Sequence, residues 1–110
     1  MRGYVPFAPA AMSWRGNPEL HRRLLRAVRE ADGPIFLLQA ENDYDLGPSE
    51  VLGTELCRKD APNRACVYPR YGTSPPAGHG DFACRGMDVW GEDVCAFLAV
   101  VLAPRATLVG

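Results

Sequence analysis

An unbroken apolar run constrains the fold of this chain more than any other feature. Residues 35–43 read I-F-L-L-Q-A-E-N-D, so the run ends in polar residues and a carboxylate. It is too short and too uniformly apolar for an amphipathic helix, and it therefore predicts a strand that is buried on both faces. Strands of this kind belong to parallel sheets whose faces are covered by helices.

The segments on either side of this run predict alternating strands and helices. The first strand is interrupted by Pro6 and Pro9, which indicates an edge or irregular strand because proline cannot donate to a ladder. Alternation of this kind builds a small three-layer α/β domain with a parallel sheet between its helices. The predicted strands are residues 3–11, 34–40 and 64–68, the predicted helices begin near residues 17, 47 and 90, and residues 69–80 are expected to form an irregular loop.

Length and charge narrow the class of protein. The 110 residues correspond to one small domain over 1–110, and the net charge of -1 gives no reason to expect nucleic acid or a membrane surface as partner. Arg22, Arg23 and Arg26 predict a solvated basic face on the first helix. No apolar stretch approaches the roughly 20 residues of a membrane span, and residues 1–6 lack the apolar core of a signal peptide. We therefore expect a cytoplasmic protein.

The cysteines do not form a recognisable metal or redox motif. No two of the four are close enough for a C-x-x-C pattern, so we expect neither a metal nor a cofactor. Cys57, Cys66 and Cys95 lie in apolar-patterned segments, which predicts buried free thiols, although the sequence leaves a disulfide open. Cys84 follows the histidine loop and is the candidate for a cysteine-based site.

An acid and a histidine are expected at the same edge of the sheet. His79 lies in the loop sequence A-G-H-G, and the other histidine, His21, is expected to be a plain surface residue of the first helix. Asp43 and Asp45 both follow the predicted strand 34–40, with Glu41 as a weaker third candidate. Because active residues of parallel sheets gather at the carboxyl ends of the strands, one of these acids can orient His79. The alternative is that some of them cap the helix that begins at residue 47.

Three stretches together carry a family resemblance. They are Q-A-E-N-D-Y-D-L-G-P-S, Y-P-R-Y-G-T-S-P-P-A-G-H-G-D-F and V-W-G-E-D-V-C-A-F-L. Over residues 4–102 the chain resembles the carboxy-terminal half of dienelactone-hydrolase-like members of the α/β-hydrolase superfamily. The resemblance implies that Asp43, in the small-x-x-Asp pattern A-E-N-D, is the acid in preference to Asp45, and that His79 is the histidine. It also implies that residues 3–11 match the strand that follows the nucleophile's own strand and helix.

The chain departs from this family at the nucleophile. The family places its serine in G-x-S-x-G, on a sharp turn between a strand and a helix, and no such motif occurs here. The serines that could replace it are Ser13, Ser49 and Ser74. The chain therefore looks like a truncated hydrolase domain that keeps the acid and the base.

Three interpretations follow from the sequence. The first is a serine-type ester hydrolase acting on small or short-chain esters, in which His79 serves as base for a serine of this chain, for a serine of a second copy, or for water. The second is a catalytically inactive fragment of the hydrolase fold that acts as a dimeric interaction or structural domain, with residues 4–8 at the interface of a homo-oligomer. The third is a cysteine-based site at Cys84.

Overall fold

The central element of the computed structural model, which describes residues 2–60 and 62–103, is strand β1 (Phe36–Ala40). It pairs in parallel with β2 (Arg64–Tyr68). On its other side the N-terminal segment also runs parallel to it, through isolated bridges from Tyr4 to Ile35 and from Phe7 to Leu38. The predicted parallel sheet is therefore present in a two-strand form, and the predicted irregular edge strand is confirmed.

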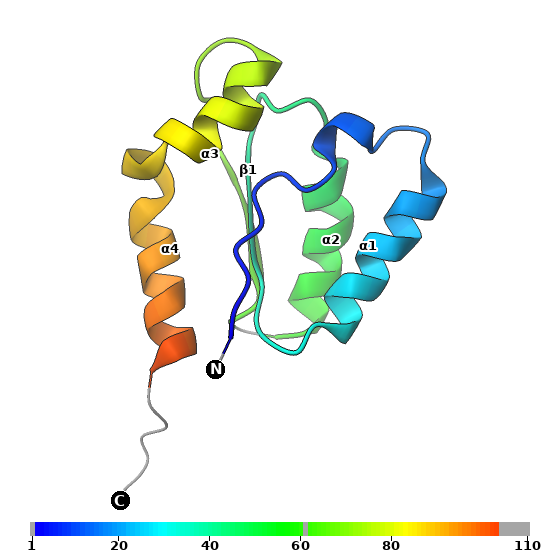
Figure 1. The fold of residues 1–110 in the computed structure, drawn as a ribbon, viewed down its shortest axis with the longest axis vertical. Helices are drawn as coiled ribbons and strands as arrows, with labels where there is room; N and C mark the ends of the chain where they lie inside the picture. The colour runs from blue at the N-terminus through cyan, green and yellow to red at the C-terminus, as the bar shows by residue number, and fades with distance from the viewer. Residues whose placement is uncertain (1, 61, 104–110) are drawn as a thin grey trace, which may run out of the picture.

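Helices cover this sheet from opposite sides. Figure 1 views the sheet edge-on, with α4 on one side, α1 and α2 on the other, and the blue N-terminal segment passing along β1. None of the helices within residues 2–60 and 62–103 is long and apolar enough to cross a membrane. The helices are α1 (Pro18–Glu30), α2 (Gly47–Arg58), α3 (Phe82–Arg85) and α4 (Met87–Leu102), with a 3₁₀ turn at Ala11–Ser13 and a π-helical turn at Ala77–Asp81.

The side chains of β1 alternate between two apolar clusters. Phe36, Leu38 and Ala40 face the α4 side and pack with residues that include Phe82 and Phe97. The neighbouring residue Leu37 faces the other way, into the cluster beneath α1 and α2. Every residue of β1 is buried. The prediction of a strand buried on both faces is confirmed, because its side chains enter an apolar cluster on each face.

The two N-terminal helices begin as their sequences predict. The Asn17 side chain accepts a hydrogen bond from the backbone N–H of Leu20 at 3.2 Å, and Pro18 opens α1. The Asp45 carboxylate accepts from the backbone N–H of Gly47 at 2.8 Å, at the start of α2. The structure thus assigns Asp45 to a helix terminus, the alternative role that the sequence offered for it.

The segment after β2 differs from the sequence prediction. The expected irregular loop 69–80 ends in helical backbone, and the short helix α3 was not predicted at all. Helix α4 begins at Met87, three residues before the expected start. The indole N–H of Trp90 donates to the backbone oxygen of Phe82 at 2.8 Å, so α3 is tied to α4 by a contact that hydrophobic periodicity does not encode.

The cysteines are more exposed than predicted. Cys57 and Cys95 are exposed and Cys66 is half-buried, and all four cysteines are free thiols. Leu56 on α2 and Phe97 on α4 are buried in the two apolar clusters, whereas Cys57 and Cys95 on the same helices are exposed.

A matched pair of truncations tests the role of β1. Leu38 is fully buried, whereas Val100 on α4 is 63% exposed. We expect Leu38→Ala to lower the free energy of unfolding by about 2–5 kcal/mol, because it leaves a cavity beside α4. Val100→Ala should change it by less than about 0.5 kcal/mol. Urea unfolding followed by circular dichroism measures both, and equal losses would contradict the central position of β1.

Candidate functional site

The structure brings Asp43 and His79 together at the carboxyl end of β1. The His79 Nδ1 atom lies 3.0 Å from Asp43 Oδ1, within hydrogen-bond distance. The Asp43 side chain is fully buried, whereas the His79 side chain is 29% exposed. The acid therefore lies beneath the histidine, and the histidine forms the accessible part of the pair.

A short turn presents the Asp43 carboxylate. The backbone N–H of Asp43 donates to the carbonyl of Ala40, the last residue of β1, at 3.1 Å. The backbone N–H of Tyr44 donates to Asp43 Oδ1 at 2.6 Å, and the Gln39 side-chain amide donates to Oδ2 at 3.2 Å. With His79 these groups give the buried carboxylate a partner on each oxygen, as burial of an ionised group requires.

Asn42 holds the histidine turn against the end of β1. Its side-chain amide donates to the backbone oxygens of Tyr71 and Ser74, at 2.8 and 2.9 Å, and its oxygen accepts from the Tyr71 N–H at 2.8 Å. Gly78 passes so close that a Cβ there would lie 2.7 Å from the Asn42 side chain. The π-helical turn then carries His79 over Asp43, and π-helical turns of this kind recur at functional sites.

This arrangement suits a general base. With Nδ1–H donated to Asp43, the imidazole keeps its lone pair on Nε2, where it can accept a proton. Tyr44 packs edge-on against the His79 ring, with ring centroids 5.6 Å apart. A buried acid below and an aromatic ring beside it restrict the orientation of the imidazole.

The structure does not bring a candidate serine to this pair. Ser49 is buried and donates its hydroxyl to the Gln39 side chain at 2.5 Å. The Ser74 hydroxyl accepts from the backbone N–H of Ala77 at 3.3 Å. Ser13 is exposed in the 3₁₀ turn. Within residues 2–60 and 62–103, no serine forms a hydrogen bond to His79.

Neither of the remaining candidates forms a side-chain hydrogen bond to the pair within the described residues. Glu41 is exposed, and Cys84 is an exposed residue of α3. His21 is more than a surface residue, because its ring stacks on Trp14 with centroids 3.8 Å apart and its Nε2 lies 2.7 Å from the Trp14 backbone oxygen. It therefore has a packing role at the start of α1.

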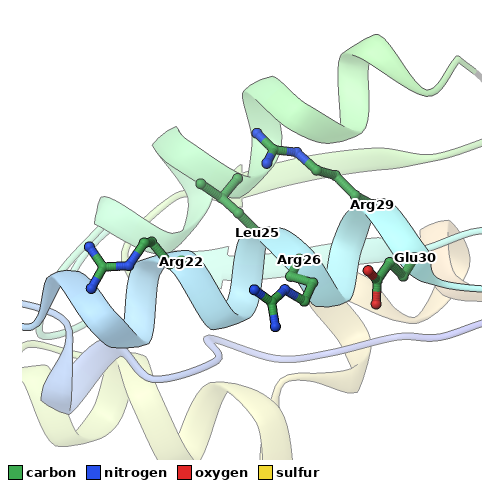
Figure 2. A pocket seen from close by; sticks show the side chains of 5 residues that line it. All are labelled: Arg22, Leu25, Arg26, Arg29 and Glu30. Carbon is green, nitrogen blue, oxygen red and sulfur yellow. The ribbon is translucent and has the colours of Figure 1, made fainter.

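Three arginines of α1 line a hollow of about 310 Å³, shown in Figure 2, and they are Arg22, Arg26 and Arg29. Arg22 pairs with Glu19 at 2.6 Å, and Arg29 reaches across to Glu55 of α2 at 3.2 Å. The hydrogen bond from Arg29 is the main cause that lowers the pKa of Glu55. Two of the arginines at this hollow thus already have carboxylate partners, which fits the predicted solvated face.

No cluster of three or more His, Cys, Asp or Glu side chains in the described part of the chain could hold a metal ion. Comparisons with family models, curated proteins and solved structures found no match to this chain. The physical description of the site therefore comes from the contacts of Asp43 and His79 themselves.

Sequence reasoning missed two residues that shape the site, Gln39 and Asn42. The available signal for Gln39 was a polar residue inside an otherwise apolar strand, which must find partners when it is buried. Asn42 stood in the polar end of the same run, but its partners Tyr71 and Ser74 are 29 and 32 residues away along the chain.

Two glycines beside the histidine provide a matched test. A Cβ at Gly78 would collide with Asn42, whereas nothing lies within 4 Å of one at Gly80. We expect Gly78→Ala to cost about 1–3 kcal/mol of stability, because the turn must move away from β1. Gly80→Ala should leave stability equal or higher by up to about 1 kcal/mol, because it restricts the unfolded chain. Urea unfolding measures the free energy of unfolding of both variants, and equal values for the two would contradict the packing of Gly78 on Asn42.

Proposed function

We propose that this chain is an ester hydrolase for small or short-chain esters, with His79 as general base and Asp43 as the acid that orients it. The observation that carries the proposal is the 3.0 Å contact between His79 Nδ1 and a fully buried Asp43 carboxylate. An acid and a histidine in this relation are two of the three groups of a nucleophilic hydrolase triad.

The reaction requires a nucleophile that His79 can deprotonate. His79 Nε2 takes a proton from an attacking hydroxyl or water as the new bond to the ester carbonyl carbon forms. The same proton then passes to the leaving alcohol as the ester bond breaks. Where a serine has attacked, a water deprotonated by His79 then hydrolyses the acyl-serine ester, which releases the acid and restores the serine hydroxyl. Ser49 and Ser74 already use their hydroxyls in other hydrogen bonds, so water or the exposed Ser13 of a second copy is the nucleophile that we propose.

The resemblance to dienelactone-hydrolase-like proteins supports this proposal. In this interpretation the sheet and its two helical faces correspond to the carboxy-terminal half of a three-layer α/β-hydrolase. The order N-terminal segment, β1 and β2 is compatible with that correspondence, and both Asp43 and His79 follow the carboxyl end of a strand.

Hydrolysis of short-chain p-nitrophenyl esters tests the proposal. We expect His79→Ala to lower kcat/KM by about 100-fold or more, because a positioned general base contributes about 10²–10⁴. Asp43→Asn should also lower it, since an amide nitrogen facing Nδ1 would favour the wrong tautomer.

Asp45→Asn is the matched control for the acid. An asparagine at residue 45 can still accept from the Gly47 N–H at the start of α2, so both the fold and the rate should be kept. A wild-type rate no higher than that of His79→Ala at equal protein concentration would refute the enzyme.

A second function is favoured by the edge of the sheet that residues 3–8 form. Backbone groups of Tyr4, Pro6 and Ala8 bond to β1, so those of Gly3, Val5 and Phe7 point away from it. None of these outward groups has a hydrogen-bond partner among the described residues. Pro6, the residue expected to blunt the edge, lies on the inward side, so all three outward residues have an N–H to donate.

We infer that a second copy of the chain covers this edge. Antiparallel pairing about Val5 would set Gly3 opposite Phe7 in each direction, so the edge is complementary to itself. An apolar groove of about 630 Å³ lies beside it, between the N-terminal segment and α1, and its lining includes Tyr4, Leu24 and Ala27. A partner that pairs with the edge would also cover this apolar surface.

Sedimentation velocity tests the dimer with two glutamate substitutions, one inside the groove and one on α4. Ala27 lines the groove on α1, and Val89 is an exposed residue of α4. We expect Ala27→Glu to weaken self-association at least about tenfold, because the carboxylate would be buried without a partner. Val89→Glu should leave it unchanged. A wild-type chain that stays monomeric at about 100 μM, well above the ~1 μM Kd of a weak but specific dimer, would rule the dimer out.

A further inference from the structure

Gln39 is the one polar residue of β1, and its side chain is completely buried. Its oxygen accepts the hydroxyl hydrogen of Ser49 at 2.5 Å. Its NH₂ group donates to Asp43 Oδ2 at 3.2 Å and to the backbone oxygen of Asp45. One side chain in the middle of the sheet thus connects α2, the turn after β1 and the acid of the candidate site.

The direction of the Gln39 amide follows from its partners. An ionised carboxylate and a backbone carbonyl can only accept hydrogen bonds, so the NH₂ group must face Asp43 and Asp45. The amide oxygen is then left for Ser49, whose hydroxyl can donate to it. The Ser49 hydroxyl therefore has a defined use in the core, which differs from the nucleophilic role considered for it from the sequence.

We propose that Gln39 is a positioning residue that sets the orientation of the Asp43 carboxylate and, through it, the tautomer of His79. The inference rests on the proposed function, since it assigns a role within that same site. The Gln39 amide holds Oδ2, and this leaves Oδ1 for the Tyr44 N–H and His79 Nδ1. With Oδ1 held there, the proton of the imidazole stays on Nδ1 and the lone pair stays on Nε2.

Removal of this amide is expected to change the tautomer of His79, although no hydrogen bond joins the two side chains. Without it Oδ2 has no donor among the described residues, and a buried oxygen without a partner favours rotation of the carboxylate. Rotation would take Oδ1 out of line with Nδ1, and the imidazole would populate both tautomers. Ser49→Ala should act in the same direction but more weakly, because it leaves the amide in place and only frees it to turn.

The test is the nitrogen-15 NMR signature of the His79 ring, which distinguishes Nδ1–H from Nε2–H imidazole. The full chain is compared with Gln39→Met, which keeps an unbranched side chain of similar length but removes the amide. Val28→Ala, a cavity in the apolar cluster beneath α1 and α2 at a side chain that makes none of these hydrogen bonds, controls for a general loss of stability. We expect the Nδ1–H form to dominate in the wild type and in Val28→Ala, and a mixture of both forms in Gln39→Met.

Activity gives a second readout on the same variants. Loss of an outer hydrogen bond to an orienting group commonly costs about 10- to 100-fold, and we expect a loss of this size in kcat/KM for Gln39→Met but not for Val28→Ala. If Gln39→Met fails to fold, the nitrogen-15 signature of the His79 ring is measured in Ser49→Ala and tests the inference in its place. An Nδ1–H form undiminished in the variant that folds would overturn the inference.

The two proposals fail in different ways. A tautomer shift in Gln39→Met together with no ester hydrolysis by the wild type would uphold the role of Gln39 and refute the enzyme. Hydrolysis that depends on His79, with a ring signature that does not respond to Gln39→Met or Ser49→Ala, would uphold the enzyme and refute the positioning role.

Discussion

The fold depends on the burial of one five-residue strand from both sides. β1 gives Phe36 and Leu38 to the core beneath α4 and Leu37 to the core beneath α1 and α2. Because a parallel strand in this position has hydrogen-bonding neighbours on both edges and helices on both faces, it fixes where β2 and the N-terminal segment must lie. The same strand positions the candidate site, because Asp43 lies three residues after the end of β1.

The candidate site is joined to this core by buried polar side chains at the end of β1. At Gln39 the strand buries an amide in place of an apolar side chain, and this amide needs the partners that Ser49 and Asp43 provide. Asn42 then connects the end of β1 to the backbone that carries His79. A buried carboxylate, a partly exposed imidazole and a turn held by the Asn42 hydrogen bonds are the conditions for an oriented base. For this reason we favour the hydrolase over a purely structural role.

The open edge and the acid–histidine pair are two separate features of the same small sheet. The edge involves the outward backbone of Gly3, Val5 and Phe7, whereas the pair lies past the end of β1. Self-association through this edge and ester hydrolysis can therefore be tested independently.

The sequence by itself determined the elements whose signals are local. The sequence alone predicted the apolar strand β1, the start of α1 at Asn17-Pro18 and the acid that follows the strand. These features could be predicted because hydrophobic periodicity, helix capping and strand ends depend on residues that are neighbours in the sequence. Only the tertiary structure decided the helical turn around His79, the exposure of Cys57 and Cys95, and the network of Gln39. These depend on contacts such as Asn42 with Tyr71, 29 residues apart, whose free energy appears only when distant segments are packed together.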